Sequence, residues 1–436
     1  MNVISRIFKL IFILFLSSSI LACTESDEVL PKESKEQGEP VELENSIVGK
    51  ILCGYQGWFN AEGDGADLGW KHYSNQGKFE PGMCSIDFWP DMSEYDEDEK
   101  FPTAFKNADG STATVFSSAH PKSVDRHFKW MQAYGINGAF VQRFVSNVRN
   151  EKLHANMTKV FENCYNASVN HNRLISVMYD LSGSKREVVE NTKKDWKLLV
   201  DKHGITDISK SNILSYKGKP VVAIWGVGFS DREYTMSDIQ ELIEFFKNDP
   251  KYGGCSVLLG VPTGWRTLER DCINDPRIHD LIKMADIVHP WTPGRYNSLE
   301  GVEQHRRDWT IADKAWSDKN DLLYMPVVFP GFSWHNLRFG ETPINQIPRL
   351  KGDFLWRQFY NGILSGAQTI YVAMFDEVDE GTCIFKCTNN PPGGDSPFAT
   401  YEGLPSDYYL WLTGEAGKMI RKEIPLSKTK PEYPKN

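Results

Sequence analysis

The chain repeats one pattern eight times: a short apolar run rich in β-branched and aromatic residues, in most cases followed by a segment with helical periodicity. The predicted strands are residues 51–55, 138–142, 174–179, 221–225, 256–259, 286–289, 323–328 and 369–374. The predicted helices are residues 123–134, 151–168, 187–203, 236–247, 301–317, 352–364 and 405–421. Near-continuous apolar strands alternating with helices predict a parallel sheet covered by helices.

Eight such repeats favour a closed (β/α)8 TIM barrel. The alternative is a doubly wound open sheet, but no predicted strand is followed by a Gly-rich phosphate loop. Residues 59–118 interrupt the pattern between the first strand and the first helix, and they contain one further predicted strand, 112–117. Loops that follow barrel strands form the catalytic face, so we expect this long insertion at the catalytic rim.

The N-terminus has the features of an export signal. Arg6 and Lys9 accompany an apolar run over residues 10–20, which is too short to span a membrane. The predicted signal peptide, 1–22, ends directly before Cys23, and this junction resembles a bacterial lipobox. It predicts a lipid anchor on Cys23 and an outer membrane lipoprotein, periplasmic or surface-exposed. An ordinary signal followed by a chance cysteine is the alternative.

The rest of the chain divides by composition into a predicted tether, one large domain and a short tail. Residues 23–46 are rich in Glu, Lys, Ser and Pro and predict a flexible tether. Residues 47–425 form one predicted catalytic domain, followed by a tail at 426–436. The net charge is -9, so nucleic acid is not an expected partner. We also expect a monomer, and no motif in the chain predicts a cofactor.

Seven cysteines remain after Cys23, and none has a zinc-ligand spacing, so no metal is expected. Cys383 and Cys387 are close enough in sequence for a local disulfide in an oxidising compartment, and core thiols are the alternative.

Aromatic and polar residues gather where the predicted strands end. The predicted substrate-binding residues are Tyr55, Trp58, Gln142, Arg143, Asp180, Trp225, Trp265, His289, Trp291, Trp334, His335 and Asp376. Aromatic rings pack against the C–H faces of sugars and polar side chains orient hydroxyls, so the set predicts a cleft for an oligo- or polysaccharide. Two alternatives stay open: several Trp residues only seal the barrel, and Arg143 makes a core salt bridge to Asp180 instead of binding an acidic sugar.

Four carboxylates follow the eighth predicted strand within five residues: Asp376, Glu377, Asp379 and Glu380. Confined carboxylates raise one another's pKa values, so one can stay protonated as a general acid while another is ionised. Glycoside hydrolysis requires this pairing. Glu377 and Glu380 would share a face if they lie on one helical turn. A calcium site or a solvated acidic loop is the alternative.

At these residues the chain resembles the glycoside hydrolase family 99 and 71 group, and more closely family-99-like lipoproteins of gut Bacteroidetes. The resemblance rests on the motif Glu-x-x-Glu-Gly-Thr at residues 377–382 and extends more loosely over 47–425. It includes GYQGWFNAEGDG at 54–65, FWPDMSEY at 88–95 and HFKWMQAYGINGAFVQRF at 127–144. Where the family has an aromatic residue and a histidine between the glutamates, this chain has Val378 and Asp379.

The resemblance implies a retaining, endo-acting glycoside hydrolase that cleaves an α-linked, mannan-like glycan. It implies that Glu380 is the general acid/base. It further implies that Glu377 is the base that deprotonates the sugar's 2-hydroxyl, so that a 1,2-anhydro sugar forms. Two other classes stay open: a non-catalytic glycan-binding lipoprotein, and a metal-dependent hydrolase that uses the acidic loop.

Overall fold

The computed structural model describes residues 44–434. The predicted signal peptide, Cys23 and residues 23–43 of the predicted tether lie outside the described residues, and so do the last two residues of the chain. Within residues 44–434, no helix is both long and apolar enough to cross a membrane.

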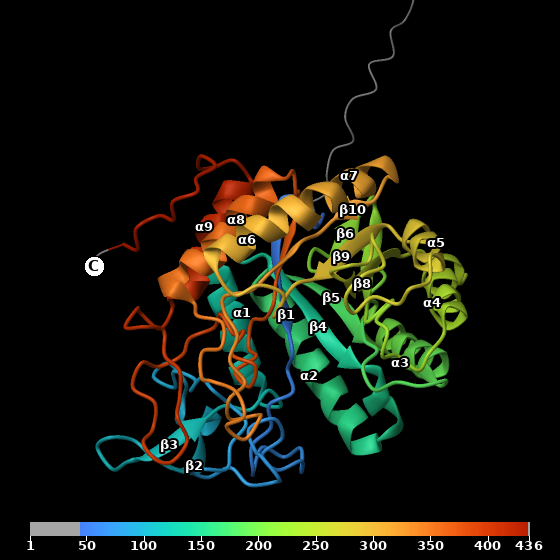
Figure 1. Ribbon diagram of the computed structural model, residues 1–436. Coiled ribbons are helices and arrows are strands. Elements are labelled where there is room, and N and C mark those ends of the chain that lie inside the picture. Colours follow the sequence, from blue (N-terminus) through green and yellow to red (C-terminus); the bar gives the residue numbers. More distant parts are fainter. Residues whose placement is uncertain (1–43, 435–436) are drawn as a thin grey trace, which may run out of the picture. The chain divides into compact units, whose positions relative to one another are not determined.

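Parallel strands form the centre of the molecule (Figure 1). The barrel strands are β1 (Ile51–Tyr55), β4 (Gly138–Phe144), β5 (Leu174–Asp180), β7 (Lys219–Trp225), β8 (Ser256–Pro262), β9 (Ile287–Trp291), β10 (Leu323–Tyr324), β11 (Val327–Val328) and β12 (Ile370–Val372). A short strand, β6 (Ser215–Tyr216), pairs antiparallel with the start of β7.

The sheet closes through one interrupted strand. β10 pairs with β9 and β11 pairs with β12, and only Met325 and Pro326 separate the two segments. Proline has no N–H to donate to a ladder, which accounts for the break. Counted together, β10 and β11 are the seventh of eight barrel strands, and β12 returns to β1. The predicted (β/α)8 barrel is confirmed.

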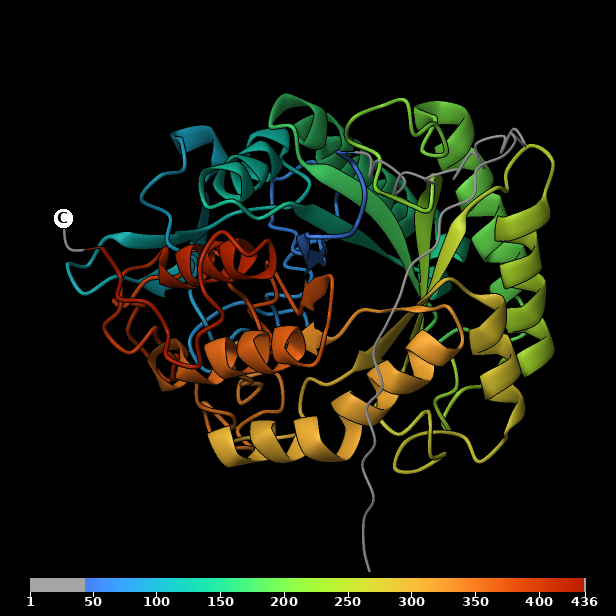
Figure 2. The same ribbon diagram turned by 90° about the horizontal axis from the view of Figure 1, so that it is seen from above.

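Helices surround the strands (Figure 2). They are α1 (Pro121–Ala133), α2 (Glu151–Asn170), α3 (Val188–His203), α4 (Met236–Asn248), α5 (Arg277–Met284), α6 (Leu299–His305), α7 (Ile311–Lys319), α8 (Asp353–Leu364) and α9 (Tyr408–Ile420). Short helical turns are η1 (Glu97–Glu99), η2 (Val145–Arg149), η3 (Arg306–Thr310) and η4 (Leu350–Gly352). The helix predicted at 301–317 is α6, η3 and α7 in succession. The sequence did not predict α5, which has only eight residues and offers little periodicity.

The insertion after β1 packs against the barrel rim, where its Lys71 and His72 line a pocket with Gln142 at the end of β4. It contains an antiparallel pair, β2 (Phe101–Lys106) and β3 (Thr112–Val115), of which only the second was predicted. Its Asp87 is fully buried and accepts hydrogen bonds from the backbone N–H groups of His335 at 2.7 Å and Asn336 at 2.8 Å. The insertion is therefore fixed to the loop that follows the seventh strand.

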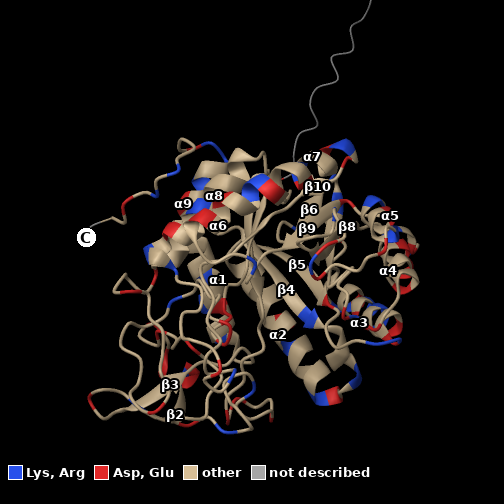
Figure 3. Ribbon diagram, in the orientation of Figure 1, with Lys and Arg blue, Asp and Glu red and all other residues tan. Residues whose placement is uncertain are grey.

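The core has two layers because strand side chains alternate in direction. Leu52, Phe140 and Met178 lie in the cluster inside the barrel, whereas Cys53 and Val141 lie in the cluster between strands and helices. Charged residues are concentrated on helices and loops, and the strand ribbons are mostly free of them (Figure 3). Alternation also decides which residue at each strand end faces the barrel axis.

Candidate active site

A cavity of about 290 Å³ opens at the carboxyl ends of the strands. Its walls come from the segments that follow six of the eight barrel strands. The lining residues are Gln56, Trp58, Gln142, Phe144, Asp180, Ser182, Trp225, Trp291, Met374, Glu377 and Glu380. This is the face of a (β/α)8 barrel on which catalytic groups lie.

Glu377 is held rigidly in this cavity. It is 4% exposed, and its carboxylate accepts a hydrogen bond from Gln56 Nε2 at 2.6 Å and another from the Thr382 hydroxyl. The backbone N–H groups of Thr382 and Cys383 both donate to the Glu377 carbonyl at 3.1 Å, which closes the turn that contains the motif. Two donors on the carboxylate favour its ionised form.

Glu380 lies on the same turn in a different environment. Its side chain is partly exposed to the cavity and has no hydrogen-bond partner among residues 44–434. Burial, followed by the nearby Asp379 and Asp180 carboxylates, raises the pKa of Glu380 to about 7. Burial and the charge of Glu380 also raise the pKa of Glu377. Glu380 differs from Glu377 in that no donor among these residues holds its carboxylate, and a pKa of about 7 lets it both hold and release a proton.

Several buried polar atoms on the cavity wall have no partner in the protein. They are Gln56 Oε1, Trp58 Nε1 and Trp225 Nε1. Buried polar groups are nearly always hydrogen-bonded, because an unmade bond costs about 1–3 kcal/mol. A ligand with several hydroxyl groups would satisfy both the acceptor and the two donors.

Aromatic rings shape the cavity. Trp225 and Trp291 meet edge to face, with ring centroids 5.2 Å apart. Trp58 is stacked against His72 at 3.9 Å and against Phe144 at 5.1 Å. Because His72 and Phe144 stack on the Trp58 ring, a ligand can reach only the ring edge and the indole N–H.

His72 connects the insertion to the catalytic turn. Its Nδ1 is 3.1 Å from Asp379 Oδ2, and burial lowers the pKa of His72 to about 3, so the ring is neutral. Burial raises the pKa of Asp379 to about 8. Asp379 thus positions His72, whose ring stacks on Trp58. No local sequence pattern predicts this contact, because 307 positions separate His72 from Asp379.

A second cavity, of about 210 Å³, adjoins the first and is called the side pocket below. The two cavities share Gln56, Trp58, Gln142 and Phe144. The other side-pocket residues come from the insertion, from the segment after β4 and from α2. They are Gly57, Asn60, Leu68, Lys71, His72, Ser146, Asn147, Leu153, Asn156, Met157 and Val160.

Among the predicted substrate-binding residues, five line the catalytic cavity: Trp58, Gln142, Asp180, Trp225 and Trp291. Tyr55 does not, because it points into the helix layer and its hydroxyl bonds His127 Nδ1 at 2.8 Å. Asp376 is fully buried, and its carboxylate accepts the backbone N–H groups of Gln56 and Gly57. Asp376 therefore positions the loop that carries Gln56 and does not reach the cavity.

Arg143 also differs from its prediction. It is fully buried and pairs with Asp195 rather than Asp180, and it donates to the carbonyl of Met157 at 2.9 Å. His154 Nε2 contacts the same carboxylate at 2.7 Å. Arg143 thus fixes α2 to the barrel and is not available to a sugar.

Four further predicted residues lie away from both cavities. His289 is inside the barrel, edge to face with Tyr371 at 4.6 Å, and Trp265 is fully buried against Trp316. Trp334 and His335 belong to the loop that holds Asp87: Trp334 stacks with Arg338, and His335 N donates to Asp87. His289 lies within β9, Trp265 follows β8 and Trp334 and His335 belong to the loop after β11, but none of the four lines either cavity.

The structure adds cavity residues that the prediction omitted: Gln56, Phe144, Ser182 and Met374. Gln56 directly follows β1 and Phe144 is the last residue of β4, so their positions in the sequence could have placed both at the carboxyl face of the barrel. Cys383 and Cys387 are free thiols with their Sγ atoms 3.7 Å apart, so no disulfide joins them here.

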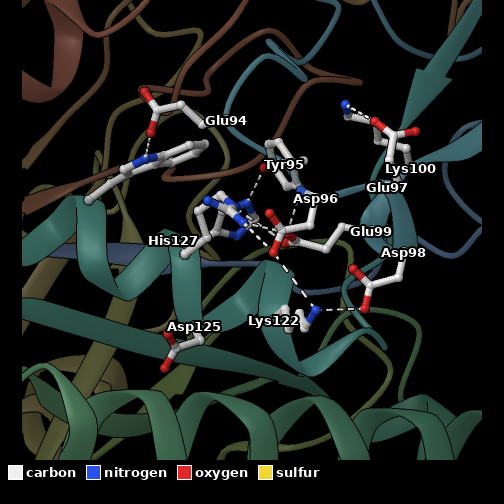
Figure 4. Close-up of polar contacts among 12 residues, drawn as sticks. Glu94, Tyr95, Asp96, Glu97, Asp98, Glu99, Lys100, Lys122, Asp125 and His127 are labelled. Atoms are coloured by element: carbon white, nitrogen blue, oxygen red, sulfur yellow. Dashed lines mark hydrogen bonds and ion pairs between the residues drawn. The ribbon is translucent and has the colours of Figure 1, made fainter.

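Among residues 44–434, carboxylates converge closely enough to suggest a cation at Asp96, Asp98 and Glu99 (Figure 4). Lys122 Nζ lies 2.7 Å from Asp98, and Arg126 pairs with Glu99. These bases already neutralise the cluster, which lies in the insertion and includes neither Glu377 nor Glu380.

Fold and site together describe a (β/α)8 protein with paired acidic groups at the carboxyl face of its barrel. A scan of protein-family models and a search of curated protein sequences found no match. Two similar solved structures are both of the family-99 endo-alpha-mannosidase from Bacteroides thetaiotaomicron. The first has a TM-score of 0.63 and 14% identity and covers 86% of this chain and 98% of that one. The second, in complex with bis-tris propane, has a TM-score of 0.60 with the same identity and coverage. At this identity, the likeness shows the fold.

Proposed function

We propose that the protein is a glycoside hydrolase. The observation that carries the proposal is the placement of Glu377 and Glu380 on one turn, inside a cavity whose walls contain unsatisfied indole N–H groups and a free amide oxygen. A sugar offers hydroxyls to those atoms and a glycosidic oxygen to a protonated carboxyl group.

The two carboxyl groups take different roles in this proposal. Glu380, which no side chain holds in its ionised form, protonates the departing glycosidic oxygen and later removes a proton from the attacking water. Glu377, whose carboxylate Gln56 and Thr382 orient, accepts the proton of the sugar's 2-hydroxyl. The 2-oxygen then attacks the anomeric carbon as the bond to the leaving group breaks, which yields a 1,2-anhydro sugar. Two inversions give net retention.

The substrate that we propose is an α-linked, mannan-like glycan. The support is the motif resemblance together with a fold similar to that of an endo-alpha-mannosidase. We further propose a monomer anchored in the outer membrane through Cys23. Cys23→Ala should release the protein from the membrane fraction, and an unchanged distribution would contradict the anchor.

The deciding experiment incubates the wild type and Glu380→Gln with α-mannans, α-glucans and host-type glycans and separates the released oligosaccharides by chromatography. We expect products from the wild type and a loss of about 10²–10⁴-fold in the variant. Glu244→Gln, on the exposed side of α4, is the matched control. Equal turnover by Glu380→Gln would refute its role. Glycan binding without products from any variant would instead favour the non-catalytic lipoprotein.

A further inference from the structure

The two adjoining cavities differ in charge. The catalytic cavity is lined by three carboxyl groups, Asp180, Glu377 and Glu380, and by no Lys or Arg. The side pocket is lined by one ammonium group, Lys71, and by no carboxyl group. This contrast stands out in a chain whose net charge is -9.

The charge of Lys71 is not compensated within the part of the chain that the structure describes. Lys71 is exposed and makes no ion pair there, and two carboxylates of the same insertion, Asp64 and Asp67, are engaged with other donors. Asp64 accepts from Asn60 at 2.9 Å and from Ser117 at 2.7 Å, and Asp67 pairs with Lys152. An anionic group in the side pocket would therefore meet a free cation.

The rest of the side pocket suits a sugar ring. Leu153, Met157 and Val160 are three or four residues apart on α2 and form one apolar stripe, which matches the C–H face of a pyranose. Asn147 and Ser146 have side chains with no partner within residues 44–434 and can hydrogen-bond hydroxyls.

We propose that the side pocket binds a sugar unit that carries an anionic substituent, a carboxylate or a sulfate ester, with Lys71 as its counter-charge. This rests on the proposed function, because the unit is taken to be part of the glycan that enters the catalytic cavity past Trp58. The three carboxyl groups repel an anion from the cleavage position, so the charged unit lies to one side of the bond that is cleaved. The natural substrate is then an anionic α-glycan of at least two units.

The test uses small probes on the full chain: the methyl α-glycosides of glucose, mannose and galactose, the matching uronates and the matching 6-O-sulfates. Saturation-transfer NMR measures their binding. We expect at least one anionic probe to bind about five- to tenfold more tightly than its neutral partner at about 50 mM salt and to lose that advantage at about 500 mM. The uronate and sulfate arms identify the substituent.

Lys71→Met should abolish the preference, while Lys159→Met, an exposed lysine on α2 outside the pocket, should retain it. Neutral probes that bind as well as anionic ones, or equal effects of the two substitutions, would overturn the inference. Turnover of a neutral glycan with no anionic preference would refute the pocket and leave the hydrolase intact. Tighter binding of an anionic probe without turnover of any glycan would support the side pocket and refute the hydrolase.

Discussion

The catalytic cavity and the side pocket share one wall but are built differently. The ends of the barrel strands and the turns directly after them supply the catalytic cavity. Ladder hydrogen bonds fix the strand ends, and backbone hydrogen bonds to the Glu377 carbonyl fix the turn that carries the glutamates. The insertion and α2 supply most of the side pocket, and side-chain contacts hold them in place: Arg143 donates to the Met157 carbonyl of α2, and His72 of the insertion contacts Asp379. In the proposed function, this division places the chemistry at the barrel strands and the selection of the glycan on the insertion and α2.

The strongest test of this division is Glu377→Gln. The amide is nearly isosteric but cannot accept the 2-hydroxyl proton, so kcat should fall by about 10³-fold or more while glycan affinity stays within about threefold. Turnover assays and calorimetry with the same glycan separate the two effects. A large loss of affinity with kcat retained would mean that Glu377 belongs to binding rather than chemistry.

Arg143→Met tests the support of the side pocket. It leaves the Asp195 carboxylate buried without its main partner, and we expect a loss of about 3–5 kcal/mol in the free energy of unfolding. Urea denaturation measures this loss, and Arg277→Met, at an exposed pair with Asp275, should change it by less than about 1 kcal/mol. Equal destabilisation by the two substitutions would show that the buried pair stabilises the fold no more than an exposed pair does.

Asp379→Leu tests the wall between the cavities. Loss of the bond to His72 should free Trp58, and we expect KM to rise about tenfold with a smaller change in kcat. Asp379→Asn keeps an acceptor for His72 and should restore most of the affinity. If the leucine and asparagine variants behave alike, the carboxyl group acts on Glu380 and not through His72.

The smallest expected effect is in the pH profile. Glu380 acts as an acid only when protonated, and its pKa is raised to about 7, so kcat should be half-maximal near pH 7 and fall about tenfold per unit above it. A profile flat up to pH 9 would show that proton donation by Glu380 does not limit the rate.

The sequence predicts which residues end each strand, but it does not show which of two neighbouring side chains faces the barrel axis. Gln142 and Arg143 are adjacent at the end of β4, and the prediction assigned both to the substrate. Because strand side chains alternate, only one can face the barrel axis; the structure points Gln142 inward and Arg143 toward α2. Tyr55 and Gln56 differ in the same way, since Tyr55 lies in the helix layer.

The sequence by itself determined the barrel and the position of the acidic turn. Strand and helix periodicities are local, and the carboxyl face of a parallel barrel is fixed by chain direction. The tertiary structure decided which strand-end side chains meet, that His72 reaches Asp379, and that Lys71 stands unpaired in its own pocket. These facts depend on how residues 59–118 pack over the barrel rim. No local pattern encodes a contact between residues some three hundred positions apart.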